Sequence, residues 1–245
     1  MLNIVIPMAG YGSRFAKAGY VLPKPLIPVK GVPMIQAVLE NLKPSVEHRF
    51  ILICQKEHLV KHPLRELIHS VSPGAEVIGI DGVTEGAACT VLLAKELINT
   101  DEPMMIANCD QYVDISLDTY LEGMSKGGYD GYIMTMTADD PKWSFIKFDE
   151  QGLVSTVVEK QVISDEATVG IYNYAKGSDF VKAAEEMIAA NDRVNGEFYV
   201  APVYNYLYAK GCRIGYMNIG SERNGMYGLG IPEDLVYFNE NVNLR

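Results

Sequence analysis

A short apolar run followed by a glycine-rich turn opens the chain. Residues 2–6 (LNIVI) are mostly aliphatic and β-branched, which is the composition of a buried strand. Gly10, Gly12 and Ser13 follow at once, so the strand is expected to end in a tight turn. Glycines let backbone amides approach a charged ligand closely, and successive N–H groups in such a turn form an anion-binding concavity. The segment therefore predicts a phosphate-binding loop at the end of the first strand.

Two basic side chains accompany this loop. Arg14 places a permanent guanidinium beside the predicted concavity, and Lys24 adds a compact ammonium further along. Pro23 and Pro25 flank Lys24 and restrict the directions in which its side chain points. A G-x-G-x-R segment after a strand is also common in turns that bind no ligand, so the loop alone leaves both interpretations open.

The longer N-terminal pattern favours a loop that binds phosphate over a turn that binds no ligand. G-x-G-x-R is followed by P-K-P-L-x-P-V and then G-x-P-M-I, a combination that resembles the nucleotidyltransferases that make nucleotide sugars, the sugar-1-phosphate pyrophosphorylases. A dinucleotide-binding fingerprint would carry a third glycine, where this chain has Phe15. The resemblance implies a Rossmann-like α/β/α fold of three layers with a mostly parallel mixed sheet. It implies catalytic roles for Arg14 and Lys24, and nucleotide contacts from Met8, Ala9, Gly10, Gly12, Ser13, Arg14 and Lys24.

The order of the expected elements agrees with that fold, because apolar runs alternate with stretches of helical spacing, as in a parallel sheet covered on both faces. Strands are expected at 2–6, 50–54, 75–80, 104–107, 132–137, 143–148, 154–158, 167–174 and 212–219. Helices are expected at 34–42, at 57–71 with an interruption at Pro63, at 87–97, and after an N-cap at Ser178. No repeat, low-complexity tract or linker divides the chain, so residues 1–245 are expected to form a single nucleotidyltransferase domain.

Composition limits the expected partners and location. The formal net charge of −10 argues against non-specific binding of nucleic acid or an anionic membrane, so a phosphate site must be basic only locally. The four cysteines are widely spaced without a C-x-x-C pair and are expected to be buried thiols rather than disulfides or zinc ligands. No leader-like segment and no long apolar run is present, which predicts a cytoplasmic protein.

A second loop is expected to reach the nucleotide base. Thr84, Glu85 and Gly86 form a turn before the helix that starts at Ala87. The family that this chain resembles contacts the base with such a loop, usually as G-T-A, whereas this chain has Gly86-Ala87-Ala88 and lacks the threonine. The resemblance implies that Glu85 and Gly86 lie near the base. Packing of small residues against the sheet is the alternative for Ala87.

A carboxylate follows the strand expected at 104–107. Asn108 and Asp110 stand at the carboxyl end of that strand, where open α/β sheets bind their ligands. Mg²⁺ prefers one or two carboxylates together with phosphate oxygens and water, so Asp110 is a candidate Mg²⁺ ligand; capping of the next turn is the alternative. Similarity to the G-D or N-x-D element of the family favours the metal. It also implies that Asn108 contacts the nucleotide and Asp110 the acceptor.

The acceptor site is inferred from the resemblance alone. Glu159-Lys160 resembles the V-E-K-P element of the family, whose lysine contacts the acceptor phosphate, although Gln161 replaces the proline. A strand with a glycine follows that element, and a Gly-Glu pair lies against the acceptor in the family. The resemblance thus implies acceptor contacts from a set of dispersed residues, namely Asp110, Glu159, Lys160, Gly170, Asn195 and Glu197.

The C-terminal segment departs from the family at one position. Residues 227–235 (YGLGIPEDL) resemble the ending W-x-D-x-G-T-P-E-D-L, in which the aspartate is the second metal ligand. This chain has Gly228 in its place. Either Asp110 holds the metal with phosphates and water alone, or another carboxylate substitutes, for which Glu222 is a candidate.

The resemblance implies transfer of a nucleoside monophosphate from a nucleoside triphosphate to a phosphorylated acceptor, with release of pyrophosphate. The attacking acceptor phosphate is already an anion, so catalysis reduces to aligning two polyanions and neutralising the developing charge. Arg14 is expected to hold the pyrophosphate, Lys24 the α-phosphate, Asp110 the Mg²⁺ and Lys160 the acceptor. The family favours a pyrimidine triphosphate (CTP, UTP or dTTP), with GTP as the alternative, and a role in capsule or surface polysaccharide. A sugar 1-phosphate is the favoured acceptor, and a hexose, a heptose or a phosphorylated non-sugar such as a polyol or an amide all stay open. A homodimer is the default assembly.

Two other functions stay open. Asn108-Cys109-Asp110 resembles the D-x-D element of glycosyltransferases, which consume a nucleotide sugar and release a nucleoside diphosphate instead of pyrophosphate. Gly228 in place of the aspartate suggests a non-catalytic nucleotide-sensing subunit with a decayed site. The presence of Arg14, Lys24 and Asp110 argues against decay.

Overall fold

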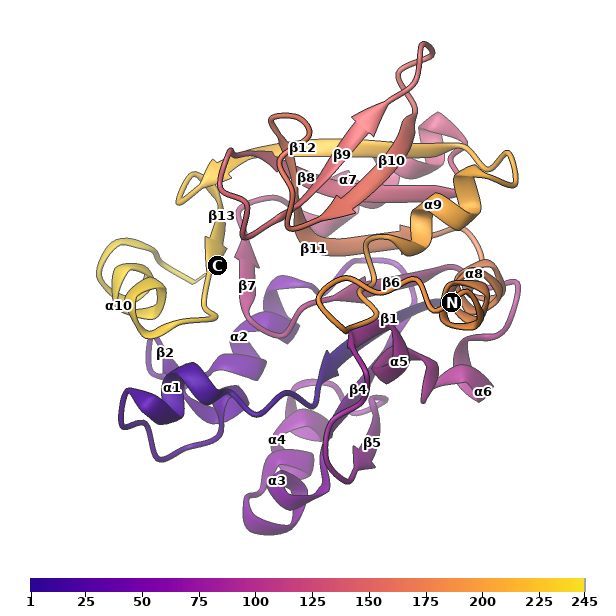
Figure 1. Cartoon of the computed structure of the whole chain (residues 1–245). Coiled ribbons are helices and arrows are strands. Elements are labelled where there is room, and N and C mark those ends of the chain that lie inside the picture. The colour runs from indigo at the N-terminus through magenta and orange to yellow at the C-terminus, as the bar shows by residue number, and fades with distance from the viewer. Residues whose placement is uncertain (245) are drawn as a thin grey trace.

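The computed structural model describes residues 1–244, which form a central sheet with helices on both faces (Figure 1). The strands are β1 Leu2–Met8, β2 Pro28–Val29, β3 Val32–Pro33, β4 His48–Gln55, β5 Glu76–Ile80, β6 Met104–Ala107, β7 Gln111–Val113, β8 Gly131–Thr137, β9 Ser144–Phe148, β10 Val154–Glu159, β11 Glu166–Tyr174, β12 Ile214–Glu222 and β13 Gly225–Gly228. The helices are α1 Ser13–Lys17, the 3₁₀ turn η1 Lys24–Leu26, α2 Met34–Asn41, α3 Lys56–Lys61, α4 Leu64–Val71, α5 Ala87–Leu92, α6 Lys95–Ile98, α7 Leu117–Gly127, α8 Gly177–Ala189, α9 Val203–Tyr208 and α10 Pro232–Asn241.

The main sheet is mixed and has eleven strands. Nine of them follow the order β5-β4-β1-β6-β11-β8-β12-β13-β7, while β9 pairs with β10 and β11 beside this path. The pairs β4–β5, β1–β4, β1–β6, β8–β12 and β12–β13 are parallel, and β11 runs antiparallel to both β6 and β8. The expected three-layer α/β class with a mixed sheet is therefore confirmed.

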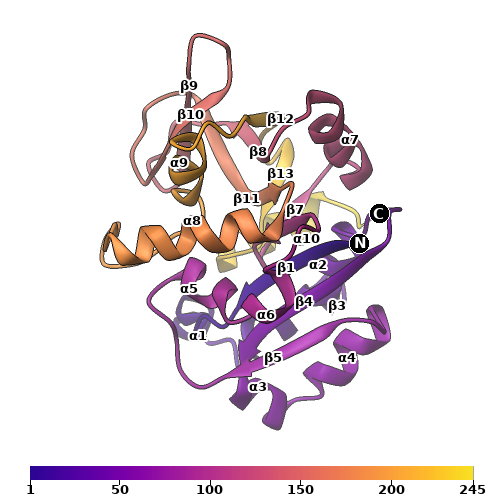
Figure 2. The same cartoon turned by 90° about the vertical axis from the view of Figure 1, so that its right-hand side faces the viewer.

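Alternation along the strands produces a separate core on each face of the sheet. In β1, Ile4 and Ile6 point into the core that contains α2, whereas Val5 points into the core that contains α5 and α8. Side chains of a strand alternate between faces, so an all-apolar strand serves both cores at once. Figure 2 looks onto the face that α5, α6 and α8 cover. The apolar run at 2–6 is thus the buried strand that its composition predicts.

Two helix boundaries differ from expectation. The helix expected at 87–97 is divided into α5 and α6, with Leu93 and Ala94 between them. Helix α8 begins at Gly177, and Ser178 does not cap it. Instead, the amides of Gly177 and Ser178 donate to the carbonyl oxygens of Glu102 and Thr100, at 2.9 Å each. The loop between α6 and β6 therefore satisfies two of the first N–H groups of the helix in place of a side-chain cap.

The topology gathers several loops at one edge of the sheet. Strands β1 and β6 are parallel neighbours, so the loop after Met8 and the segment 108–110 leave the sheet side by side. Helices α1 and α10 lie on the same side of the molecule in Figure 1. None of the helices within residues 1–244 is long and apolar enough to cross a membrane. The four cysteines are free thiols, as expected, although only Cys54 is fully buried.

Candidate active site

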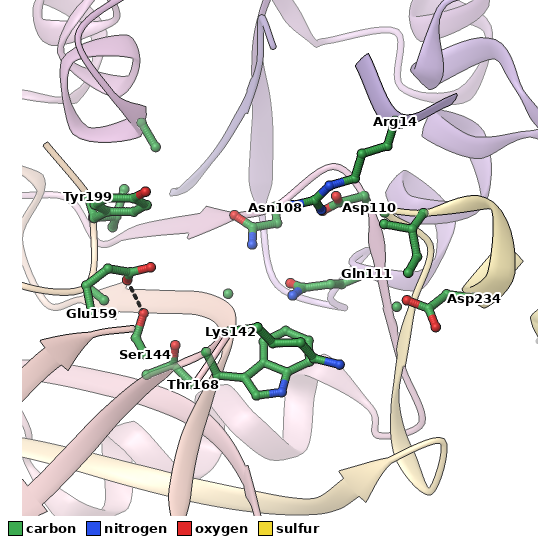
Figure 3. Close-up of a pocket in the computed structure, with 18 of the residues that line it drawn as sticks. Arg14, Asn108, Asp110, Gln111, Lys142, Ser144, Glu159, Thr168, Tyr199 and Asp234 are labelled. Atoms are coloured by element: carbon green, nitrogen blue, oxygen red, sulfur yellow. Dashed lines mark hydrogen bonds between the residues drawn. The ribbon is translucent and has the colours of Figure 1, made fainter. Parts of the chain in front are cut away.

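Two adjoining cavities open where β1, β6 and β13 end. The larger has a volume of about 950 Å³ and the smaller about 280 Å³, and Asn108 and Asp110 line both. Arg14, Glu159 and Gly170 line the larger cavity, which Figure 3 shows in close-up. Met8, Gly10, Gly12 and Lys24 line the smaller one. Part of the predicted nucleotide and acceptor residues thus lines two cavities that share Asn108 and Asp110.

The glycine loop lies close against Lys24. Gly12 adopts the left-handed conformation (φ 61°), and a Cβ at this position would lie 3.1 Å from the Lys24 Cβ. Both the conformation and the close approach favour glycine. Ala9 contributes through its backbone, because its carbonyl oxygen accepts a hydrogen bond from the buried side chain of Gln55. The loop is therefore hydrogen-bonded to Gln55 of β4 and packs closely against Lys24 of η1.

Lys24 and Asp110 form an ion pair across the junction of the two cavities. Their side chains are 17% and 25% exposed, so most of each charge is removed from solvent. Burial alone would lower the pKa of Lys24, but the Asp110 carboxylate outweighs that effect and raises the pKa above its ordinary value. Lys24 therefore remains an ammonium in the folded protein. The two residues that sequence reasoning assigned to phosphate and metal neutralise each other here.

The predicted base loop is tied to the segment that precedes α9. The Gly86 backbone (φ 135°) passes so close to Phe198 that any Cβ would collide with it. The Phe198 amide donates to the Glu85 carbonyl oxygen at 2.8 Å, and the Ala88 amide donates to the Phe198 carbonyl oxygen at 3.0 Å. The Glu85 carboxylate pairs with Arg193, whose guanidinium lies 4.1 Å from the Phe198 ring centroid. Gly86 thus permits a close contact that binds the two loops together.

Two carboxylates approach the backbone at Gly228 and Gly230. A Cβ on Gly230 would lie 2.7 Å from Asp110 Oδ2, and one on Gly228 would lie 3.0 Å from Asp234 Oδ2. Asp234 belongs to the first turn of α10 and lines the larger cavity (Figure 3). Glu222, the candidate from the sequence, instead pairs with Lys142 at 2.9 Å. The glycines thus leave room for carboxylates supplied by other segments.

The donor set fits a magnesium ion. No group of three or more His, Cys, Asp or Glu side chains that could hold a metal exists within residues 1–244. Mg²⁺ needs no such group, because it is usually held by one or two carboxylates and completes its shell with substrate phosphates and water. Asp110 and Asp234 both line the larger cavity, where Asp110 pairs with Lys24 and Asp234 lies 3.5 Å from the Arg223 guanidinium.

The far end of the larger cavity is lined by hydrogen-bonding side chains. Glu159 is 9% exposed and accepts a hydrogen bond from the Ser144 hydroxyl, while the hydroxyls of Thr168 and Tyr172 are 2.9 Å apart. Burial raises the pKa of Glu159 above its ordinary value, although the bond from Ser144 opposes this effect. This end therefore offers a carboxyl group and hydroxyls to a ligand that carries hydrogen-bond donors.

Several predicted residues lie outside the walls of the two cavities. Lys160 is exposed and its ammonium donates to the Tyr199 hydroxyl at 2.6 Å. Asn195 and Glu197 are exposed in a tight turn, in which Val194 bridges Glu197. Ala9, Ser13, Glu85 and Gly86 do not line either cavity. Their assignment to the nucleotide or the acceptor stays a prediction.

Sequence reasoning missed several residues that line the larger cavity. They come from α1, β7, the start of β9, β11, the segment around Tyr199 and α10, and they include Lys17, Gln111, Lys142, Trp143, Ser144, Thr168, Tyr172, Tyr199 and Asp234. Trp143 offered a signal, because it is the single tryptophan of the chain and follows a lysine at the start of an expected strand. Thr168 and Tyr172 offered none, because both read as ordinary strand residues.

Known proteins resemble this chain in sequence. The family model for nucleotidyl transferase matches residues 4–199. The bifunctional protein GlmU of Burkholderia mallei (strain SAVP1) is 24% identical over 223 residues, which cover 87% of this chain and 46% of that protein. GlmU of Burkholderia thailandensis matches with the same identity and coverage. The chain thus spans about half the length of these curated relatives.

Solved structures share the fold over almost the whole chain. A nucleoside-diphosphate-sugar pyrophosphorylase from Vibrio cholerae RC9 superimposes with a TM-score of 0.81 at 27% identity, covering 97% of this chain and 100% of that one. A UDP-glucose pyrophosphorylase complexed with UDP-glucose gives a TM-score of 0.76 at 19% identity, over 98% and 97% of the two chains. The family match covers most of the chain and agrees with the fold and with the glycine loop. The chain belongs to the nucleotidyl transferase family.

Proposed function

We propose that this enzyme transfers a nucleoside monophosphate from a nucleoside triphosphate to a sugar 1-phosphate and releases pyrophosphate. The observation that carries the proposal is the Lys24–Asp110 ion pair at the junction of two cavities, with Arg14 on the wall of the larger one. The ammonium of Lys24 can bind a phosphate, and the carboxylate of Asp110 can hold a metal ion that binds phosphates as well. Such a pair suits a reaction between two phosphate groups. The similarity to a nucleoside-diphosphate-sugar pyrophosphorylase supports the same reaction.

The proposed roles follow from charge and position. A phosphate oxygen of the acceptor attacks the α-phosphorus, the bond to the bridging oxygen of pyrophosphate breaks, and no proton has to be removed from the nucleophile. Lys24 binds the α-phosphate, Arg14 binds the departing pyrophosphate, and the amides of the glycine loop hold the remaining phosphate oxygens. Catalysis consists of alignment and charge neutralisation, which preorganised cations provide.

We propose Mg²⁺ as the metal, with Asp110 as its first ligand. When bound, the ion neutralises phosphate charge that Lys24 and Arg14 leave unbalanced. We propose Asp234 as the second ligand, in place of the aspartate that the family pattern has at position 228. Its carboxylate approaches the backbone at Gly228. Glu222 is the weaker candidate, since it lines neither cavity and Lys142 holds its carboxylate at 2.9 and 3.1 Å, a closer contact than the 3.5 Å between Arg223 and Asp234.

The nucleotide and the biological role are further parts of the proposal. A pyrimidine triphosphate (CTP, UTP or dTTP) is the proposed donor, and the product is a precursor of capsule or surface polysaccharide. Residues 1–245 act as one cytoplasmic nucleotidyltransferase domain, with a homodimer as the expected assembly and no nucleic-acid or membrane partner. The formal net charge of −10 supports the last point, because it disfavours polyanionic partners.

The first experiment is thermal melting with CTP, UTP, dTTP, GTP and ATP, each with and without Mg²⁺. A ligand at about 100 times its Kd stabilises the folded state by about 2.7 kcal/mol, which a melting curve resolves. The triphosphate with the largest shift is then incubated with sugar 1-phosphates, and pyrophosphate is measured. Pyrophosphate release that requires Mg²⁺ supports the proposal. Release of a nucleoside diphosphate from a nucleotide sugar, or binding without turnover, contradicts it.

A further inference from the structure

Lys17 is a basic side chain on the wall of the larger cavity that the roles above leave unused. It belongs to the last turn of α1, is exposed, and lines the cavity together with Arg14. Neither of these two cations has an ion-pair partner within residues 1–244. The other basic residue of that wall, Lys142, is paired with Glu222 at 2.9 Å. Two neighbouring cations therefore lack a counter-charge, although the chain has a formal net charge of −10.

The local fold of α1 turns Lys17 and Arg14 toward the cavity. Lys17 follows Arg14 by three residues, and residues three apart are neighbours on the surface of a helix. Phe15 lies between them in the chain, is buried, and packs edge-on against Tyr20 with ring centroids 5.1 Å apart. The Tyr20 amide donates to the Phe15 carbonyl oxygen at 3.1 Å, so the chain turns back directly after the helix. The buried ring thus fixes the inward face of α1 and leaves both cations on the cavity side.

The pairing of Lys17 with Arg14 is unfavourable in the free protein. Neighbouring like charges destabilise a helix, and α1 has no acidic residue in its first turn to offset them. An anion that contacts both side chains would remove the repulsion and accept charge-assisted hydrogen bonds from each of them. The arrangement therefore suits a ligand that carries several negative oxygens close together.

The proposed triphosphate is such a ligand, and the cations assigned to it so far are few. Lys24 shares its charge with Asp110, which leaves Arg14 as the assigned cation without a counter-charge in the described part of the chain. Figure 3 shows Arg14 and Glu159 on opposite sides of the larger cavity. Because Lys17 is the helical neighbour of Arg14, it lies at the Arg14 end, away from the carboxyl group and hydroxyls of the other end.

We infer that Lys17 is a second catalytic cation, which binds together with Arg14 the two phosphates that leave as pyrophosphate. The inference rests on the proposed function and deepens it at the leaving group. Negative charge builds up on the pyrophosphate as its bond to the α-phosphorus breaks, and a cation held beside that charge stabilises the transition state. The Lys17 ammonium has three N–H donors on a flexible stem, so it can follow the pyrophosphate as it departs.

The test compares Lys17→Met, which removes the charge, with Lys17→Arg, which keeps it. Lys182→Met is the matched control, because Lys182 is exposed on α8, lines neither cavity, and changes the net charge by the same amount. Titration calorimetry with inorganic pyrophosphate and Mg²⁺ gives Kd, and product inhibition by pyrophosphate gives the same constant during turnover. Pyrophosphate release then gives kcat and KM for the best triphosphate and for its sugar 1-phosphate, and melting reports folding.

In Lys17→Met, we expect Kd and the inhibition constant of pyrophosphate to rise about 10- to 100-fold, the range for losing a hydrogen bond to a charged group. The kcat/KM of the triphosphate should fall by a similar factor, whereas the KM of the sugar 1-phosphate stays unchanged. The Tm should stay the same or rise, because the repulsion with Arg14 is gone. Lys17→Arg should keep most of the affinity for pyrophosphate, and Lys182→Met should match the wild type.

The outcomes separate this inference from the proposed function. If Lys17→Met leaves Kd and the inhibition constant of pyrophosphate unchanged while the wild type turns over, Lys17 is only a solvated side chain and nucleotidyl transfer stands. A rise confined to the KM of the sugar 1-phosphate assigns Lys17 to the acceptor and overturns its role at the leaving group. An equal loss in Lys182→Met shows a general effect of net charge and also overturns it. A wild type that releases no pyrophosphate with any triphosphate and sugar 1-phosphate overturns the proposed function and this inference together.

Discussion

The Asp234 carboxylate lies where a side chain at position 228 would begin: Asp234 Oδ2 is 3.0 Å from the Cβ that Gly228 lacks. The family ending that residues 227–235 resemble has an aspartate at that position. Strand β13 has no carboxylate at this position. Asp234, in the first turn of α10, brings one to the same place. Asp110 approaches the same short backbone segment at Gly230, so two acidic side chains converge on one glycine-rich stretch.

Asp234→Asn should raise the Mg²⁺ concentration for half-maximal activity at least about 10-fold, because even weaker outer partners of metal ligands contribute 10- to 100-fold to metal affinity. Titration of Mn²⁺ into the complex with triphosphate, followed by electron paramagnetic resonance, measures the same loss without turnover. Glu222→Gln is the control, since Lys142 already holds that carboxylate. An unchanged metal requirement in Asp234→Asn, with a higher one in Glu222→Gln, would reverse the assignment.

Lys24→Ala should keep the fold and lose about 100-fold or more in kcat, the usual cost of removing a charge that stabilises a transition state. Lys24 is held beside Asp110 at the junction of the cavities and keeps its positive charge there. Pyrophosphate release gives the rate, and circular dichroism with melting reports the fold. Lys61→Ala on exposed α3 is the matched control, because it pairs only with Glu57 on its own helix. Normal turnover in Lys24→Ala would refute the assignment.

The acceptor KM should rise as the pH falls through the pKa of Glu159. Burial raises that pKa above the ordinary glutamate value, so the side chain takes up a proton at a higher pH than an exposed glutamate. Protonation weakens its ability to accept hydrogen bonds from the acceptor. Stability moves in the opposite direction, because a raised pKa in the folded state makes this group most favourable to folding below the ordinary pKa. That contribution is lost as the pH rises through the raised value.

Glu159→Gln should remove this part of both pH profiles. The measurement is KM for the acceptor and for the triphosphate between pH 5 and 9, with urea unfolding at the same values. If the acid limb persists in the acceptor KM of Glu159→Gln, another group causes it.

Gly170→Ala should destabilise the protein and raise the acceptor KM. Its φ of 82° is strained for any residue with a Cβ, and that Cβ would collide with Asn108 and Gln111. Gly152→Ala isolates the first effect, because Gly152 has a φ of 76° and nothing within 4 Å of the added atom. We expect about 1 kcal/mol of lost stability in Gly152→Ala from strain alone, and a larger loss in Gly170→Ala. Equal losses from urea unfolding, with unchanged KM values, would show that the collision is relieved elsewhere.

The sequence by itself determined the class of the fold and the N-terminal half of the site. Local patterns carry that information: residues 2–6 form β1, the glycine loop follows, and Asp110 comes directly after β6. Periodicity and turn chemistry act between neighbours in the chain, so a single sequence displays them. The resemblance of the glycine loop and of residues 108–110 to the family then implied Arg14, Lys24 and Asp110 as site residues, and all three line the two cavities.

Only the tertiary structure decided which residues complete the site. Asp234 and Gln111, which the sequence did not single out, come from α10 and β7, and no local pattern relates these two segments. Their meeting depends on strand order: β13 pairs with β7 while β11 bulges at Gly170. A side chain becomes a ligand or a specificity residue through burial and the absence of a partner, and those properties exist only after the segments have packed together.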